Sequence, residues 1–391
     1  MKALIIHARR TGLGILRSLA SEGIDCYVAD TFKSEGFYSK YVKKGFIIPN
    51  LIELGSESLL QSLDHISAEI DPDNEGIFLF SGSDDYLLFF VDNWSVLSIS
   101  YKATFETNKK VLSSCLAKTK MYEIAKKANV SIPSTFYSPV NTSQITDYPV
   151  IIKPSLKKTD TVDVVKDGFR IRKSRNKEEL EDAINILKTL DVDYVVQQYI
   201  PGGDETLFTA GIFAYKGALI AIATGRKLRQ FPPELGECSL GELVNEPVLE
   251  SVTAKLLNQA KLTGICQVEY KKYKEQFYLM EINPRPWSWI SLTDYAGVNL
   301  PFIAINTIES DSKKQGEVIK QREYSGYWMF PTVDFLFNVF KSKNQSFLGF
   351  IKDIKKTKKF AFWDRKDLKP FFAHIYCTLI HDFLKKRLFK S

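Results

Sequence analysis

Three side chains that carry oxygen ligands lie at the ends of two strand-like segments. Glu269 belongs to the first segment, and Glu281 and Asn283 close the second. Because side chains alternate along a strand, Glu281 and Asn283 point to the same face, and a hairpin between the segments would place Glu269 beside them. Two carboxylates and one amide oxygen are hard ligands of the kind that Mg²⁺ takes while it also holds phosphates. The residues next to Glu281 are apolar, which favours a cleft over solvated acids at a strand end.

Basic residues that could hold a phosphate occur in other predicted elements. Lys153 ends a run of four apolar or β-forming residues and precedes a proline, so its ammonium should point in one direction. Lys118 lies in an earlier predicted helix. Arg226 and Lys227 follow a glycine at the end of another strand. Each of these alone could be a solvated surface charge, but together with the carboxylates they predict a site for a triphosphate and its metal ion.

The elements that position these residues begin with a parallel sheet. Residues 2–6, 24–30 and 76–80 are strand-like, and the helical pattern between the first two gives a βαβ unit. The turn after the first strand contains TGLG, but Arg17 stands where a dinucleotide fingerprint needs a third glycine. A plain βα turn therefore explains the glycines as well as a nicotinamide site does, and a nicotinamide-dependent enzyme is kept only as an alternative.

The chain after this sheet predicts a mixed α+β module. We expect one helix at 112–129, a strand that ends at Lys153-Pro154, and a second helix whose start is marked by a capping box of Asn176 and Glu179. Strand pairs are expected within 206–230 and 264–287. The sequence has no internal repeat, so the expected fold class is α/β followed by α+β.

The composition fits a soluble globular protein of two to three domains. Of the 391 residues, 45% are hydrophobic and 25% are charged, which excludes a disordered or low-complexity chain. The five cysteines are scattered and form no C-x-x-C pair, which argues against a disulfide framework or a structural zinc site. The apolar stretch at the start is too short for a secretion signal, and no long apolar run predicts a membrane span. We therefore expect a cytoplasmic protein.

The net charge of +7 comes from the C-terminal part of the chain. Residues 341–391 hold 14 Lys and Arg against 4 Asp and Glu, so the rest of the chain has 39 basic and 42 acidic residues. This balance gives no sign of nucleic-acid binding. In the C-terminal part, basic residues alternate with Phe, Leu and Ile. That pattern suits an amphipathic helix on an anionic membrane surface or an acidic partner, or a helical appendage packed on the body.

Five motifs along residues 1–305 resemble those of the ATP-grasp carboxylate–amine ligases, in the family's order. They are Lys118-x-x-x-Tyr122, VIIKP at 150–154, VVQQYIPG at 195–202, QVE at 267–269 and EINPR at 281–285. The chain looks similar to the carbamoyl-phosphate-synthase-like and D-aspartate-ligase-like members. The resemblance implies a Rossmann-like pre-ATP-grasp domain (1–105), an ATP-grasp domain (106–310) with lobes of about 106–196 and 197–310, and a basic, helical C-terminal extension (311–391).

The resemblance also implies a role for each matching residue. Lys118 and Lys153 correspond to the two nucleotide-binding lysines, and Asp204 to the acid that takes the ribose hydroxyls. The implied hinge that holds adenine consists of Gln198, Tyr199 and Ile200. The implied ligands of Mg²⁺, or of Mn²⁺, are Glu269, Glu281 and Asn283. The implied catalytic residues are Arg285, which steadies the acyl phosphate, Arg226, which contacts the γ-phosphate or the substrate carboxylate, and Lys153.

The reaction that the family carries out needs no protein nucleophile. A substrate carboxylate attacks the γ-phosphate of MgATP, ADP leaves, and an amine then displaces phosphate from the acyl phosphate. Arg226 and Arg285 favour a small carboxylate substrate such as an amino acid. The segment 226–242 is the predicted substrate loop. Trp287 and Trp289 could form a wall of the substrate pocket or pack in the core. Whether the chain forms a homodimer is left open.

One segment departs from the family's pattern. After Lys153 the family carries a Gly-rich loop whose backbone closes over the phosphates, whereas this chain reads PSLKKTDTVDVVKD, with no glycine until Gly168. Lys157 and Lys158 could supply charge instead. The departure keeps a second function open, that of a sensor or scaffold which binds ATP without turnover.

Overall fold

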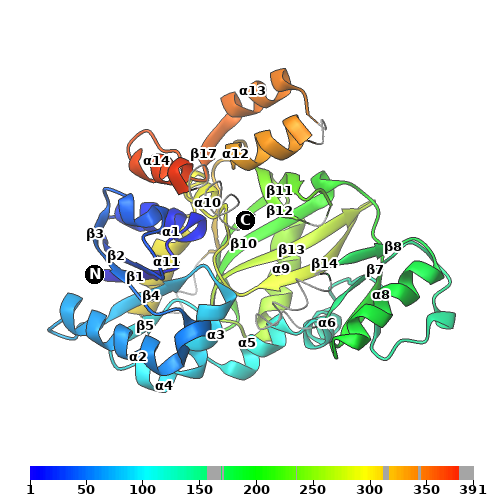
Figure 1. The fold of residues 1–391 in the computed structure, drawn as a ribbon, viewed down its shortest axis with the longest axis horizontal. Helices are drawn as coiled ribbons and strands as arrows, with labels where there is room; N and C mark the ends of the chain where they lie inside the picture. Colours follow the sequence, from blue (N-terminus) through cyan, green and yellow to red (C-terminus); the bar gives the residue numbers. More distant parts are fainter. Residues whose placement is uncertain (156–168, 170, 235, 311–316, 342–344, 378–391) are drawn as a thin grey trace, which may run out of the picture.

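In the computed structural model, the described residues form three β-sheets (Figure 1). The structure describes residues 1–155, 169, 171–234, 236–310, 317–341 and 345–377. In Figure 1 the N-terminal sheet lies on the left, the largest sheet in the centre and the smallest on the right. None of the described helices combines the length and the apolar character that crossing a bilayer requires.

A parallel sheet opens the chain, as the sequence predicts. Its strands are β1 (Lys2–Ile6), β2 (Asp25–Asp30), β3 (Val42–Ile47), β4 (Ile77–Ser81) and β5 (Tyr101–Ala103), in the order β3-β2-β1-β4-β5. Its helices are α1 (Arg10–Ala20), η1 (Glu35–Tyr38), α2 (Leu51–Ile70), α3 (Asp84–Asp92) and α4 (Trp94–Leu97). The central strands β1 and β4 are apolar and buried almost throughout, because α1 covers one face of the sheet and α2 and α3 the other.

The helix predicted at 112–129 is interrupted, which corrects that prediction. The structure has two helices, α5 (Lys109–Leu116) and α6 (Lys118–Lys127). Ala117 between them has extended backbone angles (φ −79°, ψ 116°). The break makes Lys118 the first residue of α6 and lets its backbone N–H donate to the carbonyl oxygen of Ser155, at 3.2 Å.

A small antiparallel sheet and one helix follow. The strands are β6 (Thr135–Tyr137), β7 (Val150–Pro154), β8 (Arg172–Ser174) and β9 (Tyr194–Gln198), in the order β6-β9-β7-β8, with η2 (Thr142–Gln144) and α8 (Lys177–Thr189). Asn176 caps α8 by accepting a hydrogen bond from the backbone N–H of Glu179, at 2.9 Å. The carboxylate of Glu179 accepts in turn from the backbone N–H of Arg175, so the predicted box forms with its return bond one residue earlier.

The largest sheet carries both predicted strand pairs. Its strands are β10 (Leu207–Tyr215), β11 (Ala218–Phe231), β12 (Glu237–Leu243), β13 (Gly264–Tyr273), β14 (Gln276–Asn283), β16 (Tyr327–Met329) and β17 (Thr357–Phe360), in the order β14-β13-β10-β11-β12-β16-β17, and β15 (Ile319–Lys320) pairs with β11. The helix α9 (Pro247–Ala260) packs with α6 on one face. The other face meets α1 through α10 (Ser291–Tyr295) and α11 (Leu300–Glu309), and η3 (Asp204–Thr206) precedes β10.

The described part of the C-terminal extension contains helices, as expected, and also short strands. Its helices are α12 (Pro331–Asp334), the π-helix η4 (Phe335–Lys341), α13 (Phe347–Lys356) and α14 (Lys369–Tyr376). The short strands β16 and β17 prolong the largest sheet beyond β12. Asp367 also accepts from Arg17 of α1 at 3.0 Å. The residue that replaces the third glycine of a dinucleotide fingerprint therefore ties the extension to the N-terminal sheet.

Two tryptophans between the N-terminal sheet and the largest sheet are core residues. Trp287 and Trp289 are each 3% exposed and stack edge to face. Trp287 lies directly over Gly211 of β10, and Trp289 lies over Gly225 of β11. Because these two strand positions have no side chain, the indole rings can approach the sheet. The structure therefore supports a packing role for the tryptophans rather than a wall of the substrate pocket.

We expect Gly211→Ala to destabilise the protein, because the new methyl group would overlap the indole ring of Trp287. The free energy of unfolding, measured by urea titration, should fall by about 1–3 kcal/mol. The double variant with Trp287→Phe removes the carbon atoms that the methyl group meets. Its loss should therefore be smaller than the sum of the two single losses, and strictly additive losses would contradict the overlap.

Candidate functional site

Two carboxylates and two amides face one another on the hairpin of β13 and β14. Glu269 is the cross-strand partner of Glu281, and Gln267 is the partner of Asn283, as the hairpin prediction requires. Amide groups bridge the set: Gln267 donates to Glu269 at 3.1 Å, and Asn283 donates to Glu281 at 3.5 Å. Like charges in this register repel, so the arrangement needs cations from outside the hairpin.

Two buried lysines supply those cations. The Nζ of Lys118, at the start of α6, lies 3.3 Å from an oxygen of Glu281. The Nζ of Lys227, on β11, lies 3.0 Å from an oxygen of Glu269. Burial disfavours the ammonium of Lys227 most strongly, but the charge and hydrogen bond of Glu269 together with other neighbours such as Glu281 prevail, and the pKa of Lys227 is raised. Lys227 therefore stays charged, and the structure brings it into the site although the resemblance gave it no role.

A third lysine, Lys153 of β7, reaches the same region from the small sheet. It is 7% exposed, and its Nζ lies 3.4 Å from the hydroxyl of Tyr122. Burial raises the pKa of Tyr122 to about 12, so its hydroxyl stays protonated and can donate to Gln197 at 3.2 Å. Tyr122 thus links α6, β7 and β9, the elements that carry Lys118, Lys153 and Gln198.

The predicted hinge leaves the small sheet at the end of β9. Gln197 is buried and also donates to Thr135 at 2.9 Å, whereas Gln198 is exposed and Ile200 is buried. Two ammonium groups lie near the ring of Tyr199, those of Lys173 at 3.8 Å and Lys271 at 5.0 Å from its centre.

Lys271 is a site residue that the sequence reasoning missed. It is 7% exposed, and burial lowers its pKa, because the ammonium loses hydration. The signal was available in the spacing: Lys271 stands two residues after Glu269 on β13, so both side chains lie on the same face of the sheet.

Asp204 organises the end of β11. Its carboxylate accepts hydrogen bonds from the backbone N–H and the side-chain amide of Gln230, at 2.8 and 2.9 Å, and from the backbone N–H of Glu234, at 2.8 Å. Gln230 in turn accepts from Lys227 at 3.1 Å. The predicted ribose ligand is thus connected to the carboxylate cluster through two residues. Its assignment to ribose stays a prediction.

The two arginines predicted to be catalytic lie in different places. Arg285 forms two hydrogen bonds with Asp84, at 2.7 and 3.1 Å, at the carboxyl edge of the N-terminal sheet. Glu281 contributes to its electrostatic surroundings, so Arg285 belongs to the edge of the cluster. Arg226 precedes Lys227 on β11, points to the other face and pairs with Glu242.

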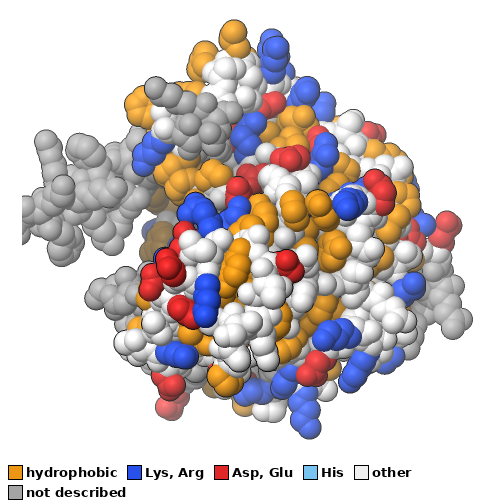
Figure 2. All heavy atoms as spheres, turned by 90° about the vertical axis from the view of Figure 1, so that its right-hand side faces the viewer, with side chains coloured by type: hydrophobic (Ala, Val, Ile, Leu, Met, Phe, Trp, Pro, Cys, Tyr) orange, Lys and Arg blue, Asp and Glu red, His pale blue; other side chains and the backbone are white. Residues whose placement is uncertain are grey.

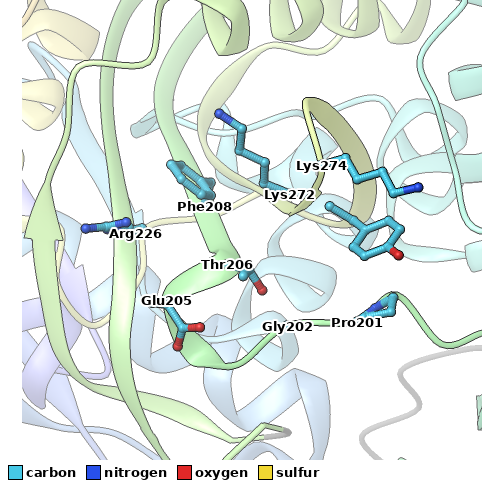
Figure 3. Close-up of a pocket in the computed structure, with 9 residues that line it drawn as sticks. Pro201, Gly202, Glu205, Thr206, Phe208, Arg226, Lys272 and Lys274 are labelled. Atoms are coloured by element: carbon cyan, nitrogen blue, oxygen red, sulfur yellow. The ribbon is translucent and has the colours of Figure 1, made fainter.

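The side of the sheet that holds Arg226 has its own shallow pocket of about 410 Å³ (Figure 3). Lys272 and Lys274 also line it. In Figure 3 the three cationic groups point away from one another, so they do not converge on one anion. The structure therefore does not bring Arg226 together with the other predicted site residues.

Two expectations remain, one for the segment after Lys153 and one for the metal ion. The Gly-poor segment after Ser155, including Lys157 and Lys158, lies outside them. Within the described ranges, no three His, Cys, Asp or Glu side chains come together as a metal site. The predicted metal ligands are two acids and one amide, and their roles stay predictions.

Comparison with known protein sequences gives one family match. Residues 191–326 match the family model described as ATP-grasp in the biosynthetic pathway with Ter operon. Curated protein sequences give no match.

Several solved structures share the fold. L-amino acid ligase from Bacillus licheniformis is 16% identical with a TM-score of 0.59, and the match covers 84% of this chain and 78% of that one. Biotin carboxylase from Campylobacter jejuni is 18% identical with a TM-score of 0.63, over 83% and 74% of the two chains. N5-carboxyaminoimidazole synthetase from Staphylococcus aureus is 13% identical with a TM-score of 0.61, over 88% and 87%. The family match over residues 191–326 and the shared fold both agree with the resemblance to the ATP-grasp ligases that the sequence motifs carry.

Proposed function

We propose that this chain is an ATP-dependent ligase that activates a small carboxylate as an acyl phosphate and joins it to an amine. The observation that carries the proposal is the cluster of Glu269 and Glu281 with three buried lysines, Lys118, Lys153 and Lys227, between the small and the largest sheets. A surplus of buried positive charge beside paired carboxylates suits a polyphosphate that arrives with a metal ion.

The cluster fits Mg²⁺ in the chemistry of its donors. Two carboxylates and the amide oxygen of Asn283 are hard ligands, and the facing pair of Glu269 and Glu281 concentrates negative charge at one point. One related structure, a 2-oxoglutarate carboxylase domain, was determined with MgADP, and the synthetase from Staphylococcus aureus with ADP. When bound, Mg²⁺ would neutralise charge on the phosphates of ATP.

The chain's own residues then act by position and charge. Lys118 and Lys153 hold the phosphates from α6 and β7, while Lys227 keeps Glu269 in place. The substrate carboxylate oxygen attacks the γ-phosphorus and the bond to the leaving ADP breaks. Arg285 stabilises the anionic acyl phosphate and the tetrahedral intermediate that forms when the amine attacks. The bond from the acyl carbon to phosphate then breaks, and an amide remains.

The carboxylate substrate that we propose is an amino acid. The L-amino acid ligase of Bacillus licheniformis shares the fold over most of both chains, and Arg285 supplies a guanidinium at the junction of the N-terminal and largest sheets. A guanidinium there suits an acid and its anionic intermediates. We place the nucleotide-binding function on Gln198, Tyr199, Ile200 and Asp204, as the resemblance implies.

The direct test is ADP formation from MgATP over a panel of amino acids and small carboxylates, each with and without amine acceptors. Turnover that needs one acid and one amine together would support the ligase. Binding of MgATP without turnover on every pair would favour the sensor that the Gly-poor segment leaves open. Failure to bind MgATP at all would contradict both functions.

We expect Glu281→Gln to lower the rate of ADP formation about 100-fold or more, because the amide removes a charged oxygen ligand and leaves Lys118 without its counter-charge. The matched control is Glu275→Gln, at the turn of the same hairpin, where the side chain is 96% exposed. An equal loss in both variants would show that the effect comes from the fold of the hairpin and not from the cluster.

We expect Lys153→Met to weaken the binding of MgATP about 10- to 100-fold in calorimetry, because methionine keeps the apolar stem but lacks the ammonium. Lys177→Met is the control, since this residue lies on α8 of the same lobe and its side chain is 54% exposed. Unchanged binding in Lys153→Met would remove this lysine from the phosphate site.

A further inference from the structure

The C-terminal extension contains a helical hairpin that projects from the body of the molecule. We define the C-terminal hairpin as residues 331–341 (α12 and η4) and 345–356 (α13). In Figure 1 it stands at the top, beyond the edge of the largest sheet. The backbone N–H of Gln345 donates to the carbonyl oxygen of Asn338 at 3.2 Å, and Phe335 packs on Phe350 with ring centres 5.3 Å apart, so η4 and α13 form one unit.

An arginine of the sheet binds both helical arms at the base of the hairpin. Arg229 of β11 binds Asp334 through two hydrogen bonds, at 2.9 and 2.8 Å, and its third nitrogen lies 2.8 Å from Asp353. Asp334 is fully buried. The hairpin is therefore a rigid part of the fold rather than a loose appendage.

The outer end of the hairpin exposes large apolar side chains. Leu348 is 74% exposed and Phe340 71%, the highest values among the large apolar residues of the described chain. Phe347 and Leu336 are 58% and 46% exposed. Phe340 lies near the end of η4, Phe347 and Leu348 open α13, and Leu336 lies near the start of η4. Exposure of this kind on a convex element marks an interaction surface.

Positive charge surrounds these side chains without compensation from the hairpin's own acids. The two acidic residues of the hairpin, Asp334 and Asp353, both bind Arg229 at the base. The exposed lysines of the hairpin are Lys341, Lys352, Lys355 and Lys356. Leu348, Lys352 and Lys355 follow one another at helical spacing on the outer face of α13, while Phe350 on the inner face is buried. Figure 2 shows hydrophobic and basic side chains side by side at the top of the molecule.

We propose that the C-terminal hairpin docks this protein on an anionic membrane surface. Its apolar groups sit on a projecting end, which suits insertion between lipid headgroups, whereas a protein partner would have to offer a matching groove. The exposed lysines lie on the same helices as the apolar side chains, so their stems can stay among apolar groups while the ammonium groups meet lipid phosphates and carboxylates. The negative surface of such a membrane complements the hairpin's charge.

The test is sedimentation of the full chain with vesicles of phosphatidylcholine alone and of phosphatidylcholine with phosphatidylserine. We expect binding to the second kind only, and weaker binding at high salt. The triple variant Lys352→Gln, Lys355→Gln, Lys356→Gln should bind about 100-fold more weakly, since each lysine near an anionic surface contributes about fivefold. The double variant Phe340→Ser, Leu348→Ser should lose about tenfold or more, because it removes the apolar groups that insert.

Two control variants, each with three substitutions, show whether the loss of vesicle binding is specific to the hairpin. Lys120→Gln, Lys126→Gln, Lys127→Gln carries the same change of charge on exposed lysines of α6 and should bind as the unaltered chain does. Lys385→Gln, Lys386→Gln, Arg387→Gln makes that change in the last residues of the chain. The proposal is overturned if the unaltered chain ignores anionic vesicles, if folded hairpin variants bind normally, or if only the last triple abolishes binding. Thermal unfolding of each variant verifies its fold.

Discussion

The site depends on the repulsion between two carboxylates that the hairpin of β13 and β14 forces into register. Glu269 and Glu281 face each other, and no change of rotamer takes either charge off that face of the sheet. Lys227 and Lys118 offset the repulsion from two other elements. Each lysine is buried, so each needs its acid as much as the acid needs the lysine. This mutual dependence fixes α6, β11 and the hairpin relative to one another and leaves a charged surface on which a metal-bound polyphosphate can be held.

Three cationic side chains of strand β11 point to three different parts of the molecule. Arg226 points to the outer face and pairs with Glu242, Lys227 enters the site, and Arg229 holds the C-terminal hairpin. Simple alternation would send Arg229 to the same face as Lys227. The pairing of β11 with β12 is irregular on both sides of Arg229, and such bulges turn a side chain away from its regular direction. One strand can therefore serve the site and the extension without placing their charges together.

The C-terminal extension joins the N-terminal sheet to the largest sheet. Asp367 accepts from Arg17 of α1, and β16 pairs with β12. His374 of α14 lies 3.2 Å from Glu35. Burial works against the charge of Glu35, but the hydrogen bond from His374 and other neighbours prevail, and the pKa of this carboxyl is lowered. Ties of this kind hold the two sheets around the junction at which Arg285 meets Asp84.

The sequence by itself determined the parallel opening sheet, the two strand pairs and which acidic, amide and lysine side chains were candidates for the cluster. These features are local, since apolar runs and alternation report which faces of a strand are buried. Only the tertiary structure decided which charges meet. The break at Ala117 that places Lys118, the bulges that separate Lys227 from Arg229 and the integration of the extension through Arg17 all depend on contacts between residues far apart in the chain. A single sequence shows which residues can do chemistry, but the pairing of distant strands selects those that do it together.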